Sequence, residues 1–251
     1  MKKINEYENL LSDADFEFLC RVYKTEDERY INRLKIIGFE GFNKVLDAGC
    51  GFGQWSMALS KLNNEVVGTD VASERIIISS SLAKAAGANN LGFKFGSLDK
   101  LPFENSSFDA VFCYGAIFLV NPKEALQEFY RVLKPNGKLY TNANGLGYAL
   151  HRWFNSPNRT KGFDPRESTV KALYNRIKLD KGLTKENGQV LIEIKEFKEL
   201  LKATGFFDFQ IKDEGTINVK SHKKIISTPF FKGEYYGFTG VYEVLATKPL
   251  V

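Results

Sequence analysis

A glycine-rich loop after a short apolar run is the feature of this sequence best suited to binding a ligand. Residues 44–47 predict a buried strand, and glycines then stand at every second position, at Gly49, Gly51 and Gly53. Glycines at this point permit a tight turn and a close approach of a ligand to the backbone. The dinucleotide-binding pattern G-x-G-x-x-G, read from Gly49, needs Gly or Ala where the chain has Gln54. The loop therefore favours a ligand other than a dinucleotide.

Two aspartates near this loop indicate the charge of that ligand. Asp47 stands two residues before Gly49, where its carboxylate would repel a pyrophosphate but suits a ligand that carries an ammonium and a sulfonium. Asp70 ends a second predicted strand, where a carboxylate can accept hydrogen bonds from both hydroxyls of a ribose. Because NAD-binding folds use an acidic residue in the same way, Asp70 alone does not separate the two kinds of ligand. Asp47 and Asp70 together favour a positively charged ligand that contains a ribose.

The elements that must position these residues alternate between strands and helices. Apolar runs predict strands at residues 44–47, 65–70, 91–96, 108–114 and 137–142. Apolar spacing and capping residues predict helices at residues 54–62, 73–86, 122–133 and 194–203. Ser73 is the predicted N-cap of the second of these helices. Such alternation indicates a parallel sheet that is covered by helices on both faces.

The predicted fold is α/β, a Rossmann-like open and mostly parallel sheet. Residues 209–219 and 237–247 read as two strands with no helix between them, which predicts an antiparallel hairpin at the C-terminal edge. The alternation lapses over the polar residues 145–190, which we interpret as an inserted lid. We predict one domain, 1–251, made of a helical cap (1–40), a ligand-binding core (41–144), the insertion (145–190), and a C-terminal helix with edge strands (191–251).

Four motifs in order resemble the class I S-adenosylmethionine-dependent methyltransferases, in particular the small-molecule, methyltransferase type 11-like members. The pattern Asp47-x-Gly49-x-Gly51-x-Gly53 resembles the first motif of that family, and Asp70 resembles its ribose-binding acid. Residues 101–111 and 131–139 resemble the segments that lead into its fourth and fifth strands. The resemblance covers residues 40–145 and implies that the protein is a methyltransferase with S-adenosyl-L-methionine as its cofactor.

The resemblance also implies which residues surround the adenine and the rest of the cofactor. Ser97 stands where the family often has an acid that accepts from the adenine amino group, and a serine hydroxyl is a weaker acceptor. The backbone amide of Leu98 would serve the adenine ring, and Asp99 is an alternative acceptor for the amino group. Tyr114, after the fourth strand, is expected in the cofactor site.

The wall of the acceptor site should come from the first 40 residues, the insertion and the turn of the hairpin. Tyr148 and Arg152 follow the fifth strand at the carboxyl edge, where open α/β sheets bind ligands, and Tyr235 with Tyr236 forms a second aromatic cluster. An aromatic wall with a few polar groups suits a small molecule. The alternative is that these aromatic residues only pack the insertion against the core.

His151 is the candidate general base of the reaction. It lies just beyond the fifth strand, and an imidazole that titrates near neutrality could take a proton from an acceptor hydroxyl. The alternative is a histidine that is hydrogen-bonded at the surface of the insertion.

We therefore expect a methyltransferase that acts on an oxygen or nitrogen of a small molecule, a sugar or a secondary metabolite. The chain has neither the motif of DNA adenine methyltransferases after the fourth strand nor a Pro-Cys nucleophile. An RNA methyltransferase and a non-catalytic cofactor-binding or scaffold protein are the alternatives. A continuous basic face formed by the arginines of the insertion would favour RNA.

Charge and cysteine content exclude several other classes. The net charge of +5 is spread along the chain, which argues against dedicated nucleic-acid binding. The three cysteines, Cys20, Cys50 and Cys113, have no metal-site spacing, so we predict no metal. No apolar run is long enough for a membrane span, and we expect a cytoplasmic protein.

Overall fold

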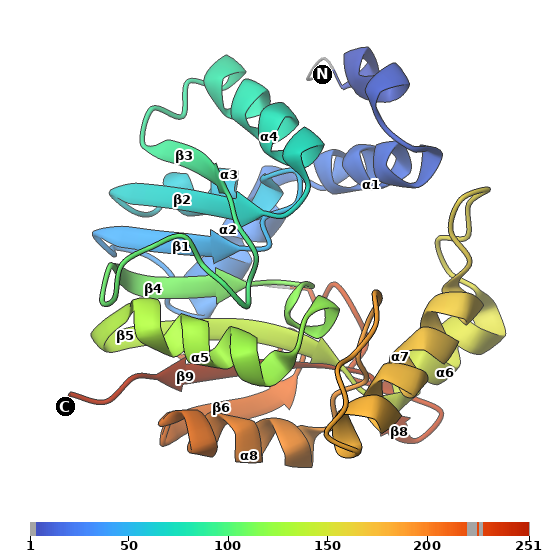
Figure 1. Cartoon of the computed structure of the whole chain (residues 1–251). Helices are drawn as coiled ribbons and strands as arrows, with labels where there is room; N and C mark the ends of the chain where they lie inside the picture. The colour runs from blue at the N-terminus through green and yellow to red at the C-terminus, as the bar shows by residue number, and fades with distance from the viewer. Residues whose placement is uncertain (1–3, 220–224, 226–227, 251) are drawn as a thin grey trace.

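The computed structural model describes residues 4–219, 225 and 228–250, and its centre is a seven-stranded sheet (Figure 1). The strand order is β3-β2-β1-β4-β5-β9-β6. The first five strands are parallel, whereas β9 runs antiparallel to both β5 and β6. Their bounds are β1 (Lys44–Ala48), β2 (Glu65–Asp70), β3 (Leu91–Phe95), β4 (Phe108–Cys113), β5 (Leu133–Asn144), β6 (Asp208–Asp213) and β9 (Val241–Thr247). The predicted open, mostly parallel sheet with an antiparallel edge is confirmed.

Helices cover both faces of this sheet (Figure 1). One face packs against α5 (Pro122–Val132) and α8 (Ile194–Thr204), and the other against α2 (Asp27–Ile36) and α3 (Gln54–Ser60). The remaining elements are η1 (Asn5–Leu10), α1 (Asp13–Lys24), α4 (Ser73–Ala85), η2 (Ile117–Leu119), α6 (Leu146–Asn155), α7 (Pro165–Asp180) and a short hairpin of β7 (Glu234–Tyr235) and β8 (Phe238–Thr239). None of the helices in the described ranges is long and apolar enough to cross a membrane.

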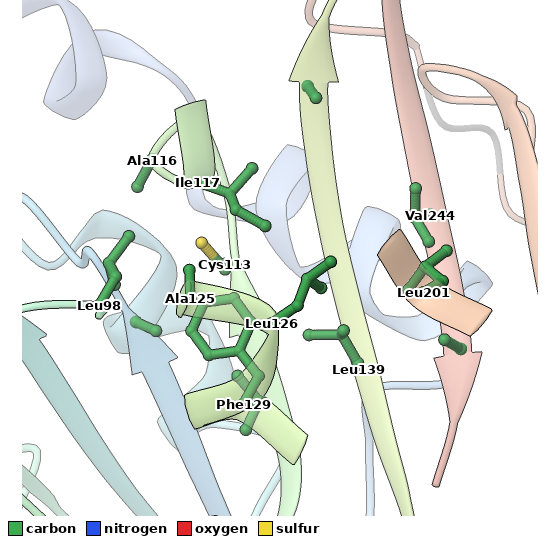
Figure 2. Packing of buried hydrophobic residues seen from close by; sticks show 14 of the residues in the cluster. Leu98, Cys113, Ala116, Ile117, Ala125, Leu126, Phe129, Leu139, Leu201 and Val244 are labelled. Carbon is green, nitrogen blue, oxygen red and sulfur yellow. The ribbon is translucent and has the colours of Figure 1, made fainter. Parts of the chain in front are cut away.

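The packing between α5 and the sheet follows from the apolar stripe of that helix. Figure 2 shows Leu126 and Phe129 of α5 beside Leu139 of β5, and all three side chains are fully buried. A fully buried leucine or phenylalanine contributes about 1.5–3 kcal/mol relative to an exposed one. On the same face Leu201 of α8 lies beside Val244 of β9 (Figure 2). These contacts fix the strands whose carboxyl ends carry the site.

Local signals set the ends of the helices, with one exception. The Asn121 side chain accepts from the Lys123 amide and Pro122 occupies the first turn of α5, while Gly205 ends α8 with a φ of 109°. The prediction that Ser73 caps α4 is wrong. The N-cap is Ala72, whose amide donates to Asp70 Oδ1, so the carboxylate orders the turn that a serine cap would otherwise stabilise.

The insertion lies at the carboxyl ends of the parallel strands and is joined to the core at its far end. In Figure 1 the arrows of β1, β2 and β4 point toward the side of the molecule where α1, α6 and α7 lie. The amide of Val190 donates to the Phe118 carbonyl, and the amide of Ile192 to the Asn144 carbonyl. Since Val190 and Ile192 are fully buried in the main core, residues 145–190 are held to the sheet at both ends.

Candidate functional site

The glycine loop after β1 has the backbone that its sequence requires. Gly49, Gly51 and Gly53 have φ values of 75°, 56° and 79°, a region that residues with a Cβ rarely adopt. A Cβ on Gly49 would lie 2.4 Å from the Cβ of Ala116 in the η2 turn. Two amides of the loop, those of Gly49 and Cys50, donate to the Thr69 carbonyl at 2.8 Å. The loop is therefore fastened to the carboxyl end of β2.

The Asp70 carboxylate lies directly beside this loop. Its Oδ2 accepts from the Gly51 amide at 3.0 Å, and its Oδ1 accepts from the Ala72 amide at 3.0 Å. The residue is only 8% exposed. Both oxygens are thus oriented at the edge of the glycine loop, the position expected for the ribose-binding acid.

Asp47, at the end of β1, is buried and has a single hydrogen-bond donor. The Ser56 hydroxyl donates to its Oδ2 at 2.5 Å, and the described residues place no cationic side chain in a salt bridge with it. Burial raises the pKa of the Asp47 carboxyl to about 7. A buried acid without a cation, beside a loop that lacks Cβ atoms, fits a ligand that brings positive charge.

A cavity of about 670 Å³ opens beside the loop, at the carboxyl ends of the strands. Its lining includes Gln54 from the start of α3 and Tyr114 and Gly115 from the end of β4. Further lining residues come from α1 and α2, from the insertion, and from Phe230 and Phe231. Asp47, Asp70 and the three loop glycines are not among the lining residues, because Phe18 of α1 lies over the loop: a Cβ on Gly51 would be 3.5 Å from its ring.

Residues 46–141 match a family described as the methyltransferase domain. The chain carries a class I S-adenosylmethionine-dependent methyltransferase domain. The cofactor inferred from Asp47, the glycines and Asp70 is thereby confirmed.

Relatives of this methyltransferase domain match only part of their own length. An uncharacterized methyltransferase, YcgJ, of Bacillus subtilis is 36% identical over 38% of this chain and 38% of its own. A demethylmenaquinone methyltransferase of Lactococcus lactis is 30% identical over 55% of this chain and 59% of its own.

Solved structures show the same fold across most of the chain. The YcgJ structure aligns with a TM-score of 0.57 at 20% identity and covers 89% of this chain and 99% of its own. A Haemonchus contortus phosphoethanolamine N-methyltransferase in complex with S-adenosyl-L-methionine aligns with a TM-score of 0.60 at 16% identity, covering 88% of this chain and 52% of its own.

In the methyltransferase domain the two candidate adenine acceptors are bonded to each other. The Ser97 hydroxyl donates to Asp99 Oδ1, and the Leu98 side chain is buried in the core near Gly49 (Figure 2). A serine oxygen that donates its proton keeps its lone pairs, so both Ser97 and Asp99 retain the capacity to accept. The assignment of the adenine contact to Ser97 and Leu98 stays a prediction.

Tyr114, predicted as a cofactor residue, lines the cavity of the methyltransferase domain and is held from below by an acid. Its hydroxyl donates to Glu214 Oε1 at 2.9 Å, and Glu214 also accepts from the amides of Phe230 and Phe231 at 2.8 and 3.1 Å. Burial raises the pKa of the Glu214 carboxyl and, to well above its ordinary value, that of the Tyr114 hydroxyl. This contact fixes residues 230–231 against the cavity.

The structure separates the predicted acceptor residues into two groups. Tyr148 and Arg152 line the cavity, whereas Tyr235, Tyr236 and His151 are not among its lining residues. The Tyr235 ring stacks on the His151 imidazole with centroids 4.3 Å apart. Tyr235 therefore reaches the cavity only through its neighbours, such as Tyr148, whose ring centroid is 6.0 Å away.

His151 faces this aromatic cluster. Its Nδ1 lies 3.1 Å from Asn155 Nδ2, which also donates to the Tyr236 hydroxyl at 2.6 Å. Burial, with a smaller contribution from Lys232, lowers the pKa of the His151 imidazole. These contacts favour the packing alternative, and the role of His151 as a general base stays a prediction.

Several cavity residues of the methyltransferase domain escaped the sequence interpretation. They are Phe18, Arg29, Asn142, Gln189, Phe230 and Phe231. Asn142 is at the end of β5, where its side chain accepts from the Gly115 amide at 2.6 Å, and the end of a predicted strand was the available signal. The others stand in segments without a motif, and only the tertiary fold brings them together.

Proposed function

We propose that this protein transfers the methyl group of S-adenosylmethionine to an oxygen or nitrogen atom of a small-molecule acceptor, a sugar or another secondary metabolite. The observation that carries the proposal is the cavity of about 670 Å³ beside the glycine loop. Cavities of roughly 300–1,000 Å³ with aromatic walls and a few polar groups are typical of small-molecule sites. The demethylmenaquinone methyltransferases among the relatives are consistent with a small acceptor.

The side chains of the domain divide into two sets of roles. Asp47, Asp70 and the glycine loop would hold the cofactor, which supplies a methyl group bonded to a positively charged sulfur. Tyr114 and Tyr148 would orient the acceptor. Methyl transfer depends mainly on aligning the nucleophile and excluding water, and a walled cavity serves both needs.

The arginines of the insertion argue against an RNA substrate. A surface that binds RNA needs exposed positive charge along one face. Here Arg152 is buried, Arg159 pairs with Asp164, and Arg176 pairs with Asp180 and Glu196. The paired and buried arginines leave little free positive charge on the insertion, which supports the small-molecule reading.

A screen with methyl-labelled cofactor tests the proposal. The purified protein is incubated with labelled S-adenosylmethionine and a panel of small hydroxyl and amine compounds, beside total RNA. We expect transfer to at least one small compound and none to RNA. Asp70→Ala should abolish the transfer, because the hydroxyls of the ribose lose their charged acceptor. Thermal melting with the demethylated cofactor runs in parallel, and a large shift without transfer to any compound would favour a non-catalytic binding protein.

A further inference from the structure

Arg152 of α6 is a buried guanidinium without a carboxylate partner. The residue is 5% exposed, and no salt bridge joins it to any acid in the ranges that the structure covers. Its Nη1 donates to Gln189 Oε1, and its guanidinium lies 5.7 Å from the centroid of the Phe163 ring. Its Nη2 is buried and has no hydrogen-bond partner. One donor of a full positive charge is therefore left unused.

Arg33 shows how this chain treats the other buried arginine. Arg33 is 0% exposed, and its guanidinium pairs with Glu243 and donates to the Ile217 carbonyl. Burial lowers the pKa of the Arg152 guanidinium, whereas Tyr140 and Glu243 outweigh burial and raise that of Arg33. A buried charge is unfavourable unless it is paired, so Arg152 lacks a partner that Arg33 has.

The position of Arg152 indicates where its missing partner would come from. Arg152 and Gln189 both line the cavity, with the Tyr148 and Phe163 rings in the same wall. The charged lining residues are four arginines and two acids: Arg21, Arg29, Arg75, Arg152, Asp15 and Glu17. Asp15 is already paired with Arg75 at 2.6 Å. The cavity thus carries an excess of positive charge, and Arg152 is its most deeply buried cation.

We propose that the acceptor carries a carboxylate and that Arg152 binds it, with the Gln189 amide as a second donor. This inference rests on the proposed function, because it assumes that the acceptor occupies this cavity. A guanidinium matches the plane of a carboxylate, and the amide nitrogen of Gln189 has two hydrogens to donate. The carboxylate supplies the negative charge that the protein itself does not provide. The aromatic rings beside Arg152 contact the remainder of the acceptor.

Equilibrium binding tests the inference without any need for turnover. Thermal melting is measured with acetate, benzoate, 4-hydroxybenzoate and succinate, each beside its uncharged carboxamide. We expect at least one carboxylate to raise the melting temperature of the wild type, with no shift from its amide. Arg152→Gln should lose this shift, Arg152→Lys should keep part of it, and the exposed control Arg159→Gln should keep all of it. Equal shifts from acid and amide, or no shift from any carboxylate, would overturn the inference.

The stability of the variants separates ligand binding from a structural role. If Arg152 serves a ligand, Arg152→Gln without ligand should be as stable as the wild type or more so, because an unpaired buried charge is removed. A strong loss of stability in Arg152→Gln would mean that Arg152 holds the insertion together, and would count against the inference.

Turnover then distinguishes a failed inference from a failed function. With an acceptor in hand, we expect kcat/KM for the acid to exceed that for its carboxamide by about a hundredfold and Arg152→Gln to erase the preference. Equal rates for acid and amide would sink the role of Arg152 and leave the methyltransferase standing. Carboxylate binding that depends on Arg152, without transfer to any acceptor, would do the reverse.

Discussion

At the residue scale, the two aspartates of the glycine loop have different surroundings although both end a strand. Asp70 accepts from two backbone amides, while Asp47 accepts only from the Ser56 hydroxyl and is 1% exposed. Backbone amides stabilise a carboxylate, and a single hydroxyl compensates burial only in part. Asp47 is therefore the costlier of the two charges to maintain in the absence of a positive ligand.

Asp47→Asn should stabilise the free protein and weaken cofactor binding. The pKa of Asp47, about 7 against an ordinary value of 3.8, means that the folded state binds more protons than the unfolded state between these two pH values. The wild type then loses stability as pH rises through that range, and the variant does not. We expect the variant to be more stable by about 1–3 kcal/mol above pH 7, with the difference disappearing near pH 4.

Two measurements check this prediction. Urea denaturation at several pH values gives the stability difference, and titration calorimetry gives the affinity for S-adenosylmethionine. Affinity should fall at least about tenfold, because the buried negative charge is lost. A variant that is destabilised at every pH would contradict the argument, and Asp109→Asn, at a half-exposed acid paired with Lys134, serves as the control.

His151→Ala tests the candidate general base. A ring that only packs on Tyr235 should change turnover by less than about threefold, which is the result that the contacts favour, whereas a base should cost about a hundredfold or more. The measurement is kcat with an identified acceptor, with cofactor affinity as the internal control. A hundredfold loss at unchanged affinity would restore the base role.

At the scale of elements, the ion pair of Arg33 and Glu243 connects α2 to β9 across the face of the sheet. Glu243 also accepts from the Tyr140 hydroxyl at 2.7 Å and from the Ile217 amide at 2.5 Å. The pair therefore joins the N-terminal helices, two strands and the segment after β6. Both charged side chains are 0% exposed, so neither can be solvated when its partner is missing.

Arg33→Met should lower the free energy of unfolding by about 3–5 kcal/mol, because it leaves the Glu243 carboxylate buried without a counter-charge. Urea denaturation measures the change. Lys35→Met on the same helix, at a half-buried lysine without a salt bridge within the described residues, should change it by less than about 0.5 kcal/mol. A loss below about 1 kcal/mol in Arg33→Met would show that the other hydrogen bonds of Glu243 suffice.

At the scale of the whole molecule, the N-terminal helices close the site from above the strands. Phe18 of α1 packs on Phe52 with ring centroids 5.7 Å apart, and Asp15 of α1 pairs with Arg75 of α4. The α1 helix lies at the carboxyl ends of β1 and β2 (Figure 1). Since Phe18 covers Gly51, the loop becomes accessible only when α1 moves.

Phe18→Ala should therefore raise the association rate of the demethylated cofactor several-fold. Removing the ring weakens the closed arrangement and opens the path to the loop. Stopped-flow fluorescence of Trp55, which lines the cavity, follows the binding, and Leu10→Ala at an exposed N-terminal position is the control. An unchanged or slower rate would mean that the cofactor enters by another route.

The sequence by itself determined the cofactor and the sheet, because both depend on local patterns. Apolar runs define the strands, the positive φ values require glycines after β1, and Asp47 and Asp70 lie at strand ends that a parallel sheet must bring to one edge. Only the tertiary structure decided which residues form the acceptor cavity. Gln189 reaches Arg152, and Glu214 reaches Tyr114, across 37 and 100 residues of chain. Contacts over such separations depend on how helices and loops pack, which no local pattern encodes. For the same reason the structure places Tyr148 and Arg152 in the cavity wall and His151 outside it.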